Sequence, residues 1–129
     1  MRPIDKTRNK LCLVLVVDDD AGVRELCVDA LREAGYVVVA CSRGEDALRL
    51  LDDVAADVLV VDWKMPGLDG VEVARRARVR DPLLGVVMIT GEGPRAAEVG
   101  RRAGITRVLD KPFVIDDLVV AVTMLAAKR

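Results

Sequence analysis

Polar residues that suit phosphoryl chemistry stand at the ends of four apolar runs. Asp18 and Asp19 follow the first run, Asp62 follows the third, Thr90 ends the fourth, and Lys111 comes shortly after the fifth. Carboxylates that share a pocket repel one another unless a cation neutralises them, and hard oxygen ligands of this kind suit Mg²⁺. A hydroxyl and an ammonium nearby would stabilise the charge on a transferred phosphoryl group.

The apolar runs that carry these residues are continuous rather than alternating, as is typical of parallel strands covered on both faces. They are Leu11–Val17, Tyr36–Ala40, Asp57–Val61, Gly85–Ile89 and a weaker fifth at Thr106–Leu109. Between them apolar residues return at helical spacing, as from Val23 to Ala34, where Gly35 is suited to end the helix. The alternation predicts an α/β fold, a doubly wound parallel sheet with helices on both faces.

Each of the first four apolar runs is followed in the sequence by residues that typically begin a helix. Asp20 directly precedes the first helical pattern, so it is better placed as the cap of that helix than as a third metal ligand. Further signals are the pairs Ser42 with Glu45 and Asp69 with Glu72, spaced as capping boxes, and Pro94 in a first helical turn.

The ligand site of an open parallel sheet lies beyond the carboxyl ends of its strands, so these polar residues should meet at one edge. If the first and third strands are neighbours, about 5 Å apart, the carboxylates of Asp18 or Asp19 reach that of Asp62. Thr90 would donate from the strand beside Asp62, whereas Lys111, roughly 10 Å away, needs its long flexible stem. Backbone amides near Lys64 and Gly91 would add donors to the same group.

Length and charge exclude several function classes. With 129 residues and no linker or repeat, the chain is expected to be a single domain, 1–129, with residues 1–10 as a lead-in. A net charge of −1, with Lys and Arg spread along the chain, offers no basic surface for direct nucleic-acid binding. The run 11–17 is too short to insert into a membrane. Three cysteines without paired spacing favour a reducing, cytoplasmic compartment.

Four motifs, taken in order, resemble one family. They are Val16-Val17-Asp18-Asp19, the stretch Val60-Val61-Asp62-Trp63-Lys64-Met65-Pro66-Gly67-Leu68-Asp69-Gly70, Thr90-Gly91, and Lys111-Pro112-Phe113. An Asp-Asp pair alone is a weak signal, but four such elements at strand ends make a specific one. The sequence is similar over nearly its whole length to the receiver domains of bacterial response regulators, the phosphoacceptors of two-component signalling.

The resemblance implies a fold and a role for each candidate residue. The fold is a five-stranded, flavodoxin-like sheet in the order 2-1-3-4-5, as in chemotaxis receivers. The implied roles are Asp62 as the phosphoacceptor; Asp19 as a direct Mg²⁺ ligand; Asp18 as a ligand through water; Asp62 and the Lys64 carbonyl as further ligands; and Thr90, Lys111 and the amides of Lys64 and Gly91 as contacts of the phosphoryl group. The Lys111-Pro112 peptide bond is expected to be cis.

The resemblance also implies partners. The phosphoryl donor would be a histidine kinase or a histidine phosphotransfer protein, because the chain itself contains no histidine. The phosphorylated form would change its binding to a downstream target protein. The chain would then be a switch rather than an enzyme, catalysing at most its own phosphorylation and slow dephosphorylation.

Other functions compete with this one. Val108 stands where such receivers often carry a Tyr or Phe that turns inward, and this favours a phosphorylation-independent adaptor with the same fold. A hydrolase of the haloacid dehalogenase type is set aside, because its motif resembles Asp-x-Asp and the second position here is Lys64. A homodimer, and an origin in a hybrid kinase or a longer transcriptional regulator, both stay open.

Overall fold

Val-rich runs form the strands of one parallel sheet, as expected for β-branched residues that pack on both faces. The computed structural model describes residues 12–128. Its strands are β1 (Leu13–Val17), β2 (Val37–Cys41), β3 (Val58–Asp62), β4 (Gly85–Thr90) and β5 (Arg107–Asp110). Their order is β2-β1-β3-β4-β5, and every neighbouring pair is parallel. The predicted fold class and strand order are confirmed.

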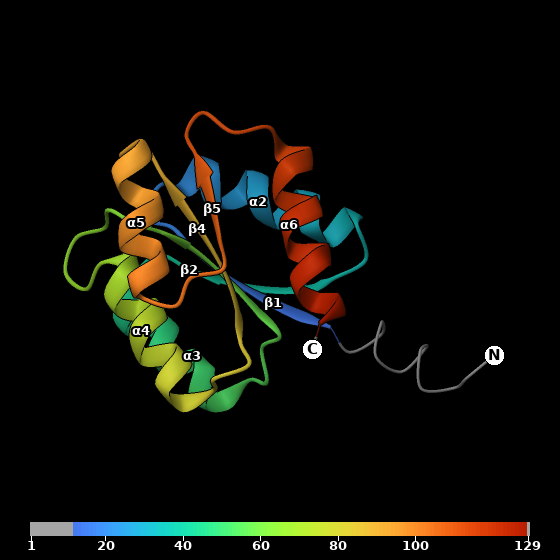
Figure 1. Cartoon of the computed structure of the whole chain (residues 1–129). Helices are drawn as coiled ribbons and strands as arrows, with labels where there is room; N and C mark the ends of the chain where they lie inside the picture. Colours follow the sequence, from blue (N-terminus) through green and yellow to red (C-terminus); the bar gives the residue numbers. More distant parts are fainter. Residues whose placement is uncertain (1–11, 129) are drawn as a thin grey trace.

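Helices cover both faces of the sheet (Figure 1). They are α2 (Ala21–Glu33), α3 (Gly44–Asp53), α4 (Gly70–Arg80), α5 (Pro94–Arg102) and α6 (Ile115–Ala127). One core packs the sheet against α2 and α6, and a second core packs it against α3, α4 and α5. Within residues 12–128, no helix has the length and hydrophobicity that crossing a bilayer requires.

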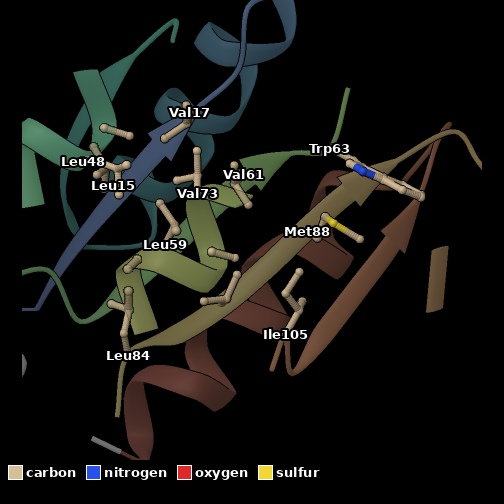
Figure 2. Packing of buried hydrophobic residues seen from close by; sticks show 14 of the residues in the cluster. Leu15, Val17, Leu48, Leu59, Val61, Trp63, Val73, Leu84, Met88 and Ile105 are labelled. Carbon is tan, nitrogen blue, oxygen red and sulfur yellow. The ribbon is translucent and has the colours of Figure 1, made fainter. Parts of the chain in front are cut away.

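The residues of β1 point alternately to the two faces, which explains why this strand is apolar throughout. Val14 and Val16 belong to the core beneath α2 and α6. Leu15 and Val17 belong to the core beneath α3, α4 and α5, which Figure 2 shows running along the strands. Because β1 is packed on both faces, the direction of the backbone at its end is fixed. Asp18, the next residue, is therefore held in one position.

The strands end at residues of the candidate site. Asp62 is the last residue of β3 and Thr90 is the last of β4, each one residue later than the apolar runs indicate. Asp62 pairs in register with Ile89, so the two strand ends lie side by side. The predicted lead-in 1–10, together with Leu11, lies outside the described residues.

Side-chain caps were predicted at the start of three helices, and two of them are confirmed. Asp20 accepts from the Val23 backbone N–H at 3.1 Å, and Asp69 accepts from the Glu72 backbone N–H at 3.0 Å. The capping box of Ser42 with Glu45 is wrong, because α3 begins one residue later, with Arg43 at its N-cap and no side-chain hydrogen bond there. Glu45 instead accepts from the Leu68 backbone N–H at 3.4 Å, in the loop that follows β3.

The close approach of α3 to that loop depends on a glycine. A Cβ atom on Gly44 would lie 2.6 Å from Val73 Cγ2 and 2.7 Å from the Leu68 carbonyl oxygen. The start of α3 therefore contacts both the loop after β3 and the helix α4 that the loop leads into. A side chain here would push apart the elements that support the end of β3.

We expect Gly44→Ala to lower the free energy of unfolding by about 1–3 kcal/mol, since the added methyl group would overpack a rigid contact. Gly22→Ala is the matched control, because its Cβ would meet only the Asp20 carboxylate at 3.4 Å, an ordinary contact. That control should leave stability unchanged or raise it slightly. Urea unfolding of both variants checks the prediction, and equal stabilities would contradict it.

Candidate functional site at the carboxyl edge of the sheet

Three carboxyl groups meet at the carboxyl edge of the sheet. Asp18 and Asp19 follow β1 and Asp62 ends β3, and one oxygen atom from each lies within 4.8 Å of the other two. Asp18 and Asp62 have exposed fractions of only 2% and 5%, whereas Asp19 is open to solvent. The parallel β1–β3 pairing brings these residues together from positions more than forty residues apart in the sequence.

Asp18 has a carboxylate oxygen that no protein group serves. Its Oδ1 accepts from the Asp20 backbone N–H at 2.9 Å, but its Oδ2 is buried and has no hydrogen-bond partner in the described part of the chain. A buried polar atom in this state is costly, and a cation held between Asp18, Asp19 and Asp62 would relieve it. Carboxylate oxygens with one member of the set exposed to water fit Mg²⁺.

An ammonium and a hydroxyl lie near Asp62, from Lys111 directly after β5 and from Thr90 at the end of β4. Lys111 Nζ is 3.1 Å from Asp62 Oδ1, and the lysine side chain is about a third exposed. Thr90 is buried, and its Oγ1 accepts from the Glu92 backbone N–H at 3.0 Å, which leaves its own hydrogen to donate. The Lys111 backbone N–H donates to the Thr90 carbonyl oxygen at 2.7 Å, and the Lys111-Pro112 bond is cis, as predicted.

Burial and mutual repulsion raise the pKa of both buried carboxyl groups. Burial is the largest cause for Asp18, and the charges of Asp62 and Asp19 add to it. The Asp20 N–H and the Lys111 charge oppose the change, and the pKa of Asp18 still rises from 3.8 to about 6. Burial likewise raises the pKa of Asp62, against the hydrogen bond from Lys111. The pocket holds more negative charge than its protein groups balance, which favours a cation.

The pKa of Lys111 is raised, although burial alone would lower it. Burial lowers the pKa of this ammonium, but the hydrogen bond that it donates to Asp62 and the charges of Asp62, Asp18 and Asp19 outweigh burial and raise it. Lys111 is therefore a permanent cation at neutral pH. One positive charge does not balance three carboxyl groups, so the pocket favours a second cation.

The residue that follows Asp62 is buried. Trp63 is only 7% exposed and belongs to the core, at the carboxyl end of the strands in Figure 2. The Lys64 ammonium covers its ring at 4.7 Å from the centroid. Gly91 is exposed, with open space where a side chain would stand. The ligand role of the Lys64 carbonyl and the donor roles of the Lys64 and Gly91 amides stay predictions.

Two residues at the site were missed by the sequence analysis. A Cβ atom on Gly70 would lie 2.2 Å from the Asp62 carbonyl oxygen, so α4 begins directly against the Asp62 peptide. The only signal was the place of Gly70 in the quoted motif. Arg24 on α2 donates from Nη1 to the Asp18 carbonyl oxygen at 2.8 Å. A backbone carbonyl as its partner leaves no pattern of residue types, so nothing in the sequence pointed to it.

Comparisons with known proteins decide the family. A family model for the response regulator receiver domain matches residues 14–123. The chain belongs to this family. The response regulator receiver protein CpdR of Brucella abortus (strain 2308) is 38% identical over 107 residues, which cover 82% of this chain and 89% of CpdR. The phosphate regulon transcriptional regulatory protein PhoB of Pseudomonas aeruginosa is 34% identical over 110 residues, which cover 82% of this chain.

The relatives differ in length. This receiver domain spans 48% of PhoB and 24% of the DNA-binding transcriptional regulator NtrC of Escherichia coli (strain K12). Among solved structures, a putative response regulator from Chloroflexus aurantiacus J-10-fl superposes with a TM-score of 0.86 at 36% identity, covering 92% of this chain and 99% of that one. The response regulator protein TrrA from Thermotoga maritima, in complex with Mg(2+)-BeF, gives 0.81 at 30%, covering 88% and 98%.

Without a divalent cation, we expect the receiver domain to gain stability as the pH falls from about 7 to about 5. Asp18 has a pKa of about 6 when folded against 3.8 ordinarily, so folding takes up a proton in this window. Asp62 shifts in the same direction. Urea unfolding at several pH values, with a metal chelator present, should show the free energy of unfolding rising as the pH falls. Asp18→Asn should weaken this dependence on pH. The same dependence in both proteins would contradict the prediction.

We expect Lys111→Met to bind Mg²⁺ about fivefold or more tightly than the unaltered protein. It removes the ammonium 3.1 Å from Asp62 Oδ1, so the pocket repels a second cation less. Lys128→Met is the control, because it removes the same charge at the far end of α6. Calorimetric titration with Mg²⁺ is the measurement. An affinity that stays the same or falls in Lys111→Met would show that this lysine does not share the cation's pocket.

Proposed function

We propose that this receiver domain accepts a phosphoryl group on Asp62 and thereby switches its affinity for a partner protein. The observation that supports this most is the ion pair of Lys111 Nζ with Asp62 Oδ1, 3.1 Å apart, in the pocket that Asp18 and Asp19 complete. A nucleophilic carboxylate, a cluster of acidic ligands and a fixed ammonium are the parts that phosphoryl transfer needs.

The donor would be a phosphohistidine on a histidine kinase or a histidine phosphotransfer protein. A carboxylate oxygen of Asp62 attacks the phosphorus, and its new bond forms as the bond from phosphorus to the imidazole nitrogen breaks. The nitrogen keeps the electron pair and takes up a proton. Lys111 donates to the phosphoryl oxygens from the side it already occupies beside Asp62, and the Thr90 hydroxyl donates from the end of β4.

A Mg²⁺ ion bound by Asp18, Asp19, Asp62 and the Lys64 carbonyl would neutralise charge on the phosphoryl oxygens. Asp18 serves this ion best through the oxygen that lacks a protein partner. The amides of Lys64 and Gly91 would add donors from the two loops that flank the acceptor. Gly91 is suited to this by exposure and by the absence of a side chain that could block the approach of the donor protein.

The phosphorylated form would carry an added charge of about −1.5 to −2 next to Thr90. Thr90 Oγ1 is held by the Glu92 N–H in the loop between β4 and α5, so a hydroxyl that turns to the phosphoryl group pulls on this loop. The affinity change for a downstream protein would then arise at α5. The chain acts as a switch and not as an enzyme in turnover.

We extend the proposal to the setting of the domain. Described residues of this chain include no paired cysteine, since Cys12, Cys27 and Cys41 are all free, and this supports a reducing, cytoplasmic compartment. The net charge of −1 supports protein partners rather than direct contact with nucleic acid. PhoB and NtrC are named as transcriptional regulators, but this chain spans less than half of either, so DNA binding is not assigned to it.

A phosphorylation-independent adaptor is the second candidate, and Val108 is the observation that favours it. Its side chain packs in the core beneath α5, where a Cβ on Gly100 would lie 3.0 Å from Val108 Cγ2. A valine fixed between strand and helix has no large alternative rotamer with which to report on Thr90. The acceptor pocket weighs against the adaptor, because it gathers charges that a pure binding scaffold does not need.

The test uses Trp63, the single tryptophan of the chain, which directly follows Asp62. We expect Mg²⁺ to change the indole fluorescence and beryllofluoride, a phosphoryl mimic, to change it again. Asp62→Asn should abolish the second change because it removes the carboxylate that the mimic joins. Asp110→Asn is the matched control, since Asp110 is an exposed carboxylate at the same sheet edge but outside the cluster. It should behave like the unaltered protein.

A covalent test accompanies the optical one. Phosphoramidate carries the same phosphorus–nitrogen bond as phosphohistidine and should add one phosphoryl group, seen by intact mass, in the presence of Mg²⁺. The unaltered chain and Asp110→Asn should gain it, and Asp62→Asn should not. A protein that answers neither Mg²⁺ nor the mimic, or labelling that persists in Asp62→Asn, would replace the switch with the adaptor.

A further inference from the structure

Three of the four Asp18 atoms that can form hydrogen bonds have a partner in the protein. Its backbone N–H donates to the Cys41 carbonyl at the end of β2, at 3.2 Å, and its Oδ1 accepts from the Asp20 N–H at 2.9 Å. Its carbonyl oxygen accepts from Arg24 Nη1 at 2.8 Å. Among the residues that the structure describes, none provides a partner for Oδ2. Three fixed atoms therefore set where the fourth can lie.

The carbonyl of Asp18 depends on a side chain because the strand can no longer serve it. The pairing of β1 with β2, the strand that the Asp18 N–H faces, ends at Val17 and Cys41, one residue before Asp18. Asp18 is 2% exposed, so water cannot easily replace a lost partner. The Arg24 guanidinium takes the place that the next residue of a neighbouring strand would otherwise fill.

Arg24 reaches this carbonyl from a well-anchored position. Its backbone N–H donates to the Asp20 carbonyl at 2.9 Å in the first turn of α2, and the Asp20 side chain caps the same turn at Val23. Asp20 and Arg24 thus hold the carboxylate and the carbonyl of Asp18 from one rigid helix start. Asp19 lies between the two held residues, so the same contacts restrain the loop that carries both candidate ligands.

We propose that Arg24 is a positioning residue for the cation site: its hydrogen bond to the Asp18 carbonyl holds the loop Asp18–Asp20 so that the acidic cluster is preformed. The proposal rests on the proposed function, because it gives Asp18 and Asp19 the role of Mg²⁺ ligands. Groups that orient metal ligands without touching the metal typically contribute 10- to 100-fold to affinity.

The sign of the effect separates positioning from simple charge. The guanidinium is a cation close to the site, and its charge already lowers the pKa of the Cys41 thiol against the larger raising effect of burial. A cation near an acidic pocket repels Mg²⁺, so its removal would tighten Mg²⁺ binding if charge were all that mattered. Loss of positioning would weaken binding instead.

The experiment compares Arg24→Ala with Arg32→Ala. Arg32 is the matched control, since it lies on the same helix and its Nη2 also donates to a backbone carbonyl, that of Val38, at 3.1 Å but away from the cluster. We expect the Kd for Mg²⁺, by calorimetry and by Trp63 fluorescence, to rise about tenfold in Arg24→Ala and to stay unchanged in Arg32→Ala. Arg24→Lys keeps the charge with a different reach and should fall between the unaltered protein and Arg24→Ala.

Urea unfolding of the same variants without Mg²⁺ separates affinity from stability, because both alanine variants lose one bond from an arginine to a carbonyl. An Arg24→Ala protein that binds Mg²⁺ as tightly as the unaltered protein, or more tightly, overturns the positioning role. An Arg24→Lys protein that equals the unaltered protein while Arg24→Ala binds more tightly assigns the effect to charge alone. If the unaltered protein binds no Mg²⁺, the proposed function fails first and the positioning role fails with it.

Discussion

The constraint on which the site depends is the crowding of three carboxyl groups in one pocket, with only one fixed ammonium beside them. Asp18 and Asp62 are almost completely buried, and burial is the largest of the causes that raise the pKa of each. Protonation at mildly acidic pH or a bound cation at neutral pH are the two ways to settle this excess of negative charge. Either a proton or a cation would stabilise the pocket, so the stability of the folded chain is coupled to pH and to cation binding at this site.

The sheet topology creates that crowding. The strand order places β1 beside β3 and β4 beside β3, so the ends that carry Asp18, Asp62 and Thr90 are consecutive along one edge. Both faces of these strands are packed, which leaves the strand ends little freedom to spread. The charges are brought together by apolar packing that takes place elsewhere in the molecule, and the stability of two cores holds the acidic pocket in place.

Much of the fold and the candidate site could be predicted because the signals are local. Continuous apolar runs mark buried parallel strands, and polar residues directly behind them must lie at the carboxyl edge. The capping prediction that was wrong concerns a helix start that depends on tertiary contacts. The start of α3 is set by the approach of Gly44 to Leu68, which overrode the Ser42 signal. Arg24 escaped notice because its partner is a backbone carbonyl.

The helix that follows Thr90, α5, has few anchoring contacts. Gly93 at its N-cap has a positive φ of 71° and offers no side-chain cap, whereas Asp20 and Asp69 cap α2 and α4. Among its described side chains only Ala96 is buried, so α5 contributes little apolar area to the core.

A thinly anchored helix next to Thr90 could take the place of a rotamer switch in the proposed function. With Val108 packed close to Gly100, a change at Thr90 has no aromatic side chain to turn, but it has a thinly anchored helix to displace. Displacing such a helix would break few apolar contacts, so new hydrogen bonds at the end of β4 would meet little resistance from the core. The valine that favours an adaptor is thus compatible with a switch, provided that the signal leaves the site through movement of α5 as a body.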